Sequence, residues 1–242
     1  MVDWRNTSEE IRASGATTAV INIGSVEQHG AHLPVGTDTI IGQHLAREVA
    51  RALGAYLLPS FAVSNCQEHM GRAGTVWLKP LTLFAVVNDV CLSLLQQGFH
   101  RVVIIPSHGG LWVLKPAVRE LNLNHEDLTV LLVPESIGGD SAAILTDSGL
   151  DLHAGEAETS MMLHLDPATV KMDLAVDGRP AVGREYLDYA TIGQVSPSGV
   201  WGAATQGTSA KGQRLLEERV EAIVRYCRET FEHVEQLRGR PR

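Results

Sequence analysis

The sequence is poor in cysteine and in aromatic residues. Its 242 residues include three cysteines, and phenylalanine, tryptophan and tyrosine together make up 5% of the chain. Cys66, Cys91 and Cys227 are widely spaced and odd in number, so they form neither a disulfide framework nor the close pairs of a zinc knuckle. Three unpaired cysteines fit a reducing compartment, and we expect a cytoplasmic location.

Long apolar runs and long basic runs are also missing. No stretch approaches the roughly 20 apolar residues that cross a membrane, and Met1–Arg5 lacks the basic and apolar regions of a signal peptide. Acidic residues outnumber basic ones by 28 to 20, which gives a net charge of −8. This balance indicates no nucleic-acid surface, and we expect neither a nucleic-acid partner nor a membrane association.

What the chain does contain is a regular alternation of short apolar runs and longer segments of helical period. This alternation predicts one α/β domain over residues 1–242, with a mostly parallel sheet covered by helices on both faces. The predicted strands are Thr17–Ile23, Ala55–Phe61, Arg101–Ile105 and Thr129–Val133, and the predicted helices are Ile40–Leu53, Leu81–Gln97, Val113–Asn124 and Ser209–Leu237, the last with Ser209 as its N-cap.

The first polar cluster follows the earliest predicted strand. Glu27, His29 and Asp38 lie in one segment rich in glycine and proline, directly after the apolar run 19–23. In an open α/β sheet, ligands bind where the chain leaves the carboxyl end of a strand. Carboxylate and imidazole ligands suit Zn²⁺, Mn²⁺ or Fe²⁺. The alternative is a polar loop in which Asp38 caps a helix.

Two further clusters follow the same rule. His108 comes after the predicted strand Arg101–Ile105 and precedes two glycines, which favours a ring directed into the crevice of the sheet. His153, Glu156 and Glu158 precede or open an apolar segment, where carboxylates are also favoured by the helix dipole. Glu156 and Glu158 are two residues apart on a helix and face different ways, so we expect only one of them at a given metal ion.

Taken together, the clusters supply Glu27, His29, Asp38, His108 and one of the two glutamates. Five ligands with one bridging carboxylate are what a site for two divalent metal ions requires, with the ions ~3.5–4 Å apart. The residues therefore predict a two-metal centre, and they leave open which of Glu156 and Glu158 is the fifth ligand.

These segments resemble the three motifs of the creatininase (creatinine amidohydrolase) family, in the same order along the chain. The resemblance rests on Glu27-Gln-His29-Gly-Ala-His-Leu-Pro with Thr37-Asp38, on Ser107-His108-Gly-Gly110, and on His153-Ala-Gly-Glu-Ala-Glu158-Thr-Ser160. It implies a three-layer α/β/α sandwich, a dinuclear metal centre that activates water, and hydrolysis of a carbon–nitrogen bond in a non-standard or cyclic small-molecule amide. It also implies a homo-oligomer, for which we expect a hexamer.

Position by position, the resemblance implies Glu27, His29, Asp38, His108 and Glu158 as the metal ligands, with Asp38 as the bridge. His153 matches the catalytic histidine of the family, and we expect it to donate a proton to the leaving nitrogen. Glu156 is expected to orient His153 or to contact the substrate. His69, in the irregular segment Ala62–Pro80, is the alternative proton donor.

The sequence also departs from the family pattern. Creatininase has a carboxylate at the position of Gly110, and most relatives have asparagine where Pro106 and Leu111 stand. The loop Ile137–Leu152 contains no tryptophan to cover a flat ring, so creatinine is not the expected substrate. A metallopeptidase, a ring-ketone hydrolase and a non-catalytic binding protein are the alternatives. A pure binding protein would need the metal ligands but not a proton donor such as His153.

Overall fold

The computed structural model describes residues 1–138 and 143–239, and these residues form a five-stranded parallel sheet between helices. The strand order is β1-β3-β2-β4-β5. The strands are β1 (Val2–Asp3), β2 (Thr18–Ile23), β3 (Tyr56–Leu57), β4 (Arg101–Pro106) and β5 (Thr129–Leu132). The central strands β2 and β4 pair along their full lengths, from Thr18 opposite Arg101 to Ile23 opposite Pro106. Their carboxyl ends therefore lie side by side.

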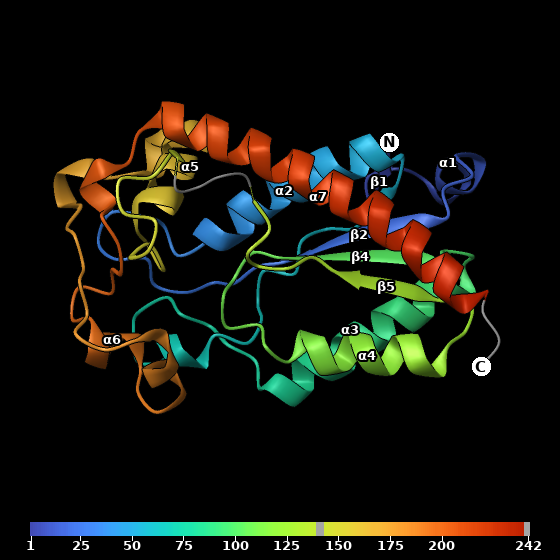
Figure 1. Cartoon of the computed structure of the whole chain (residues 1–242), viewed down its shortest axis with the longest axis horizontal. Helices are drawn as coiled ribbons and strands as arrows, with labels where there is room; N and C mark the ends of the chain where they lie inside the picture. Colours follow the sequence, from blue (N-terminus) through green and yellow to red (C-terminus); the bar gives the residue numbers. More distant parts are fainter. Residues whose placement is uncertain (139–142, 240–242) are drawn as a thin grey trace.

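Helices cover both faces of the sheet, which confirms the predicted three-layer α/β/α sandwich (Figure 1). α2 (Thr37–Leu53) and α7 (Ser209–Arg238) pack on one face, and α3 (Pro80–Gln96) and α4 (Leu114–Asn124) pack on the other. Successive residues of a strand point to opposite faces. Ile21 accordingly packs in the α3/α4 layer, while Val20 packs in the α2/α7 layer.

The remaining elements are short and cluster mainly at the ends of the sheet. They are α1 (Ser8–Ala13), α5 (Glu156–Leu165), α6 (Ile192–Val195) and the 3-10 helices η1 (Gln67–His69), η3 (Pro167–Thr169), η4 (Met172–Leu174), η5 (Arg184–Asp188) and η6 (Ala204–Gln206). In the part of the chain described, no helix combines the length and the apolar character needed to span a membrane.

Several boundaries differ from the sequence predictions. α2 begins at Thr37, three residues earlier than expected; its N-cap is Gly36 and no side chain caps it, so the helix-capping alternative for Asp38 is wrong. The predicted N-cap Ser209 is also wrong: the side chain of Thr208 accepts a hydrogen bond from the Lys211 amide, and Ser209 is already helical. The predicted strand Ala55–Phe61 pairs regularly only at Tyr56–Leu57.

Two segments were expected to be irregular. Ala62–Pro80 contains η1 and isolated bridges, and its last residue, Pro80, begins α3. Of the loop Ile137–Leu152, residues 139–142 lie outside the described residues. The expectation of a single domain over residues 1–242 stays a prediction.

The crossing of α5 and α7 gives a test of the packing. A Cβ at Gly212 would lie 1.9 Å from the backbone carbonyl oxygen of Ser160, which cannot move aside as a flexible side chain could. We therefore expect Gly212→Ala to lower the free energy of unfolding by about 1–3 kcal/mol, although alanine is the better helix former. Denaturant unfolding monitored by circular dichroism measures the change. Gln213→Ala, at the exposed next position, is the control, and equal stability of both variants would contradict the close crossing.

Candidate metal centre

Buried carboxylates and imidazoles gather at the carboxyl ends of β2 and β4. Glu27 and His29 follow β2, and His108 follows β4 by two residues. Asp38 lies in the first turn of α2 and Glu158 in the first turn of α5. The three polar clusters of the sequence therefore converge at one edge of the sheet, as predicted from their positions after apolar elements.

Asp38 lies between two histidines. Its Oδ1 is 3.3 Å from His29 Nε2, and its Oδ2 is 3.4 Å from His108 Nδ1. The hydroxyl of Ser25 also donates to Oδ2, at 2.8 Å, and helps to fix the carboxylate. On the side of His108, Glu27 Oε2 approaches the same Nδ1 to 3.0 Å. On the side of His29, Glu158 Oε2 lies 3.6 Å from Nε2.

The histidines are oriented by acceptors outside the cluster. A backbone carbonyl can only accept a hydrogen bond, so the ring nitrogen that faces it carries the proton. His29 Nδ1 donates to the carbonyl of Glu27 at 3.1 Å, and His153 Nε2 donates to the carbonyl of Gln28 at 2.8 Å. The other nitrogen of each ring faces the carboxylates, with His153 Nδ1 3.6 Å from Glu27 Oε1. This is the arrangement by which proteins present histidine lone pairs to metal ions.

The electrostatics of the cluster favour a cation. Glu27 is fully buried, and its carboxylate oxygens face ring nitrogens of His108, His69 and His153. Burial raises the pKa of Glu27. Burial would lower the pKa of His29, but Asp38, Glu158 and Glu27 outweigh it and raise this pKa to about 10. Buried carboxylates concentrated in this way are normally paired with positive charge or coordinate a metal ion.

The donor atoms fit such an ion. Four overlapping groups of three residues each bring their ligand atoms within 4.8 Å of one another, and they combine oxygen and imidazole donors. Donors of this kind suit Zn²⁺, Mn²⁺ or Fe²⁺. The groups are Glu27/His29/Asp38, His29/His153/Glu158, Glu27/His69/His153 and Glu68/His69/His108.

The two glutamates of α5 point to different places, as their spacing on a helix predicted. Glu158 lies at the cluster, and its Oε2 accepts a hydrogen bond from the Ala154 amide. Glu156 is buried elsewhere: its carboxylate accepts from the amide and hydroxyl of Thr146 at 2.8 and 3.0 Å and pairs with Lys211. These contacts favour a structural role for Glu156 over a role at the substrate.

His153 is held in place by a short antiparallel bridge. Its backbone exchanges hydrogen bonds with Trp201, at 3.0 and 2.8 Å. The next residue, Ala154, has a φ of 49°, a left-handed conformation that costs about 1–3 kcal/mol in a residue other than glycine. Strain of this size persists where the surrounding structure fixes it, and here it allows the Ala154 amide to reach Glu158.

Two residues of the irregular segment join the site as well. His69 Nε2 lies 3.3 Å from Glu27 Oε1, and Glu68 Oε1 lies 3.0 Å from His108 Nε2. The sequence predicts His69 only as an alternative proton donor, and it predicts no role for Glu68. The sequence signal for both residues is an acid next to a histidine in a loop. Because the loop has no helical or strand periodicity, the sequence does not indicate that it packs against the first motif.

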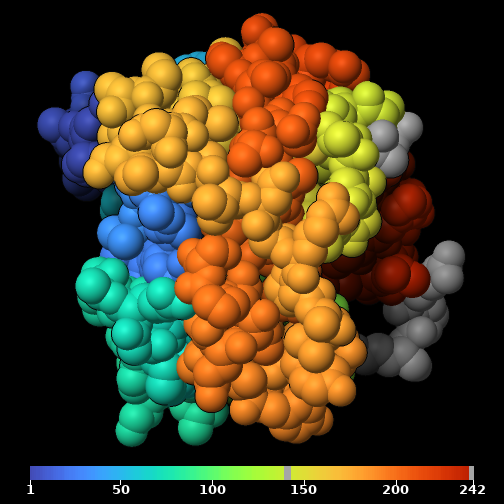
Figure 2. All heavy atoms as spheres, turned by 90° about the vertical axis from the view of Figure 1, so that its left-hand side faces the viewer, coloured from blue at the N-terminus to red at the C-terminus, as the bar shows by residue number. Residues whose placement is uncertain are grey.

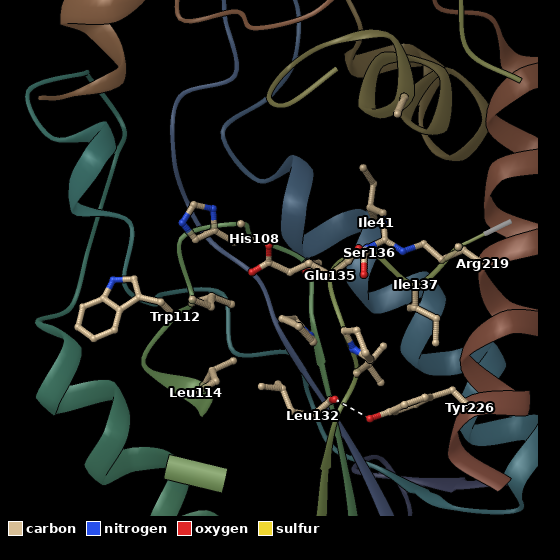
Figure 3. Close-up of a pocket in the computed structure, with 18 of the residues that line it drawn as sticks. Ile41, His108, Trp112, Leu114, Leu132, Glu135, Ser136, Ile137, Arg219 and Tyr226 are labelled. Carbon is tan, nitrogen blue, oxygen red and sulfur yellow. Dashed lines mark hydrogen bonds between the residues drawn. The ribbon is translucent and has the colours of Figure 1, made fainter. Parts of the chain in front are cut away.

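A large cavity reaches the cluster. It has a volume of about 1200 Å³, and His108 and Glu158 form part of its wall. Figure 3 shows His108 and Trp112 at one side of this cavity and Arg219 and Tyr226, from α7, at the other.

Figure 2 views the end of the molecule at which the cluster lies, and the orange segment after α5 runs across that face. Within this segment, the carbonyl of Gly199 accepts from Gln28 Nε2 at 3.1 Å.

A parallel α/β sheet thus carries, at its carboxyl edge, a buried carboxylate–histidine cluster whose donor atoms could hold divalent metal ions. The family model described as "Creatininase: Creatinine amidohydrolase" matches residues 4–227. The chain therefore belongs to the creatininase family of amidohydrolases, and the family prediction is confirmed.

Individual relatives agree with this assignment. The mycofactocin precursor peptide peptidase of Mycobacterium ulcerans (strain Agy99) is 34% identical over 218 residues, which cover 85% of this chain and 82% of the relative. The creatinine amidohydrolase of Pseudomonas putida is 27% identical over 247 residues, covering 94% and 95%. A solved structure described as "Creatininase Mn" superposes with a TM-score of 0.82 at 24% identity, covering 95% of this chain and 98% of that one, and supports the fold.

The buried contact between Glu156 and Lys211 yields a prediction that separates folding from metal binding. Lys211→Met would leave the buried Glu156 carboxylate without its cation, and because Lys211 is itself partly exposed we expect a cost of about 1–3 kcal/mol. We expect lower stability in denaturant unfolding but unchanged metal content by elemental analysis. Arg214→Met, an exposed position of the same helix, should change neither quantity. Loss of metal from the Lys211 variant would instead connect Glu156 to the centre.

Proposed function

We propose that this protein hydrolyses an amide bond with the help of two divalent metal ions. Glu27, His29, Asp38, His108 and Glu158 would hold the ions, with Asp38 as the bridge. The observation that carries the proposal is the position of Asp38, whose two oxygens face His29 and His108 separately. These five residues offer carboxylate oxygens and imidazole nitrogens, which suit Zn²⁺, Mn²⁺ or Fe²⁺.

These five residues would hold divalent ions, which when bound supply a water of pKa lowered toward ~7 and a positive charge for the carbonyl of the substrate. The protein must then move a proton to the leaving nitrogen. Burial, the largest cause, holds the pKa of His153 well below its usual value, so this ring starts neutral and must take up a proton before it can donate one. Because Nε2 donates to the carbonyl of Gln28, the accepting atom is Nδ1, and the same atom would deliver the proton.

The cavity favours an extended amide substrate over a compact ring. Its volume of about 1200 Å³ exceeds the usual range for small-molecule sites, ~300–1000 Å³. The 34% identical relative is named a precursor peptide peptidase, which agrees with a substrate of peptide character. Cyclic amides, as hydrolysed by an enzyme of the creatinine amidohydrolase type, are the second candidate because the chain is similar to that enzyme over 94% of its length.

One experiment tests the proposal as a whole. Elemental analysis of the purified chain should find two divalent ions per chain, and a screen of short peptides, formamides and cyclic amides should reveal turnover that a chelator removes. A protein that binds two ions but hydrolyses none of these would support the non-catalytic alternative. Hydrolysis of a ring ketone without amide cleavage would favour the carbon–carbon hydrolase.

Asp38→Ala tests the bridge. Loss of the carboxylate shared by both sides of the centre should release at least one ion, since each of His29 and His108 would lose an oxygen ligand beside it. The measurement is the number of metal equivalents per chain after dialysis. Glu48→Ala, on the same helix but on the solvent side, serves as the control. Two equivalents retained by the Asp38 variant would show that Asp38 is not the bridge.

His153→Ala tests proton transfer. We expect both ions to remain and turnover to fall about a hundredfold or more, the usual effect of losing a general acid–base group. Metal content and rate are measured on the same preparation. Full activity would remove His153 from the mechanism. Loss of metal would make it a ligand, a role that its Nδ1 geometry also permits.

A homo-oligomer, with six copies as the expected number, completes the proposal. Trp112 is 63% exposed at the mouth of the cavity, and exposed aromatic residues are enriched at protein interfaces. Trp201, in contrast, is buried, and its backbone pairs with that of His153. Sedimentation at micromolar concentration should give a mass several times that of one chain; a monomeric mass would contradict the proposal.

A further inference from the structure

His108 differs from the other oriented histidines in its outer partner. His29 and His153 donate from their outer nitrogens to backbone carbonyls. The outer nitrogen of His108, Nε2, instead faces a carboxylate, with Glu68 Oε1 at 3.0 Å. Its inner nitrogen, Nδ1, faces Glu27 and Asp38. The ring of His108 thus lies between the carboxylate of Glu68 on its outer side and the carboxylates of Glu27 and Asp38 on its inner side.

Glu68 lies beside His108 in a loop whose backbone is fixed by hydrogen bonds. Glu68 belongs to η1, which follows Ser64 in the chain. The loop is fastened on both sides: the Leu78 amide donates to the carbonyl of Ser64 at 2.7 Å, and the Val76 amide donates to the carbonyl of Val26 at 2.9 Å. The second bond fixes the loop directly beside Glu27. Glu68 is therefore held by the same structure that positions a metal ligand.

Gly110 makes the necessary space. A Cβ at this position would lie 1.9 Å from Glu68 Oε1 and 2.4 Å from His108 Nε2. Any side chain at position 110 would thus enter the gap between the carboxylate and the ring. The absence of a side chain there is a condition for the contact, so Glu68 and Gly110 act as a matched pair around His108.

We propose that Glu68 is a positioning residue for the metal centre. By accepting the proton of Nε2, its carboxylate fixes the tautomer and orientation of His108 and makes Nδ1 a more basic ligand for the ion that it would share with Glu27 and Asp38. The proposal rests on the proposed function, because it assigns the contact a purpose at a bound ion. In this role Glu68 would act through His108, in contrast to a direct ligand in the group Glu68/His69/His108.

The test measures metal affinity in the zinc-loaded, full-length chain by competition with a chromophoric chelator. Glu68→Ala should weaken one of the two ions about 10–100-fold, the usual effect of losing the partner of a ligating histidine. Glu68→Gln should lose less, since an amide oxygen still accepts a hydrogen bond from Nε2. Gln67→Ala, its neighbour in η1, is the matched control and should bind zinc like the unmodified chain.

Two further measurements separate this role from a general loss of structure. Long-range ¹H–¹⁵N spectra of the zinc-loaded protein should show His108 protonated at Nε2 in the unmodified chain and in Glu68→Gln, with the Nε2 signal shifted in Glu68→Ala. Gly110→Ala, which keeps Glu68 but fills the gap, should weaken the same ion. Circular dichroism identifies any variant that has not folded, and Glu68→Gln then provides the folded comparison.

The outcomes distinguish the two proposals. If the unmodified chain binds two ions and Glu68→Ala keeps both the affinity and the His108 spectrum, Glu68 has no positioning role. If Glu68→Ala loses a full equivalent of zinc at saturating concentration, Glu68 is itself a ligand, and the proposal is equally overturned. If the unmodified chain binds no zinc, the proposed function fails instead.

Discussion

The burial of negative charge at the carboxyl edge of the sheet is the constraint on which the site depends. The carboxylates of Glu27 and Asp38 are removed from water between β2, β4 and the segments that follow them. Burial raises the pKa of Glu27. Burial would also raise the pKa of Asp38, but His29 and His108 outweigh it and hold that pKa well below its usual value. Ion pairs buried in this way add little to stability, so their presence indicates a chemical purpose.

The fold supplies these carboxylates from helix N-termini as well as from loops. Asp38 and Glu158 both lie in the first turn of a helix, where the helix dipole favours a negative charge. This contribution is small beside the cost of desolvation: burial, with the nearby charge of Asp38, raises the pKa of Glu158 to about 7. Full ionisation of the cluster near neutral pH therefore requires more positive charge than the helix ends provide. A pair of divalent ions would meet that requirement.

The sequence predicted those features whose causes are local. β2 and β4 are buried on both faces and consist mostly of apolar residues, and Glu27 and His108, which follow them, lie together in the cluster. α1 was missed because it is short and mostly polar, although Thr7 and Glu10 form a capping box at its start. The N-cap of α7 was predicted one residue late: Thr208 and Ser209 can both cap a helix, and the hydrogen bond from the Lys211 amide is made to Thr208.

Features that depend on distant partners could not be predicted. Helical spacing correctly separated Glu156 from Glu158, but the direction of Glu156 is set by Lys211, 55 residues further along. Glu68 lies in a segment without periodicity, and it reaches His108 because a bridge joins Val76 to Val26. A motif lists the side chains that can bind an ion, whereas long-range backbone contacts decide which of them meet.

The same difference between local and long-range causes applies to the ring nitrogens of the histidines. His29 offers Nε2 to the cluster because its Nδ1 donates to a carbonyl only two residues away, so its tautomer is a property of the motif. His153 and His108 offer Nδ1, and their outer acceptors, the carbonyl of Gln28 and the carboxylate of Glu68, come from 125 and 40 residues away. The identity of the residues in the cluster is therefore encoded locally, but for His153 and His108 the nitrogen that faces the cluster is not. Two chains with identical motifs can thus differ in metal affinity through residues that never contact the ion, because the outer acceptor sets both the geometry and the basicity of the inner nitrogen.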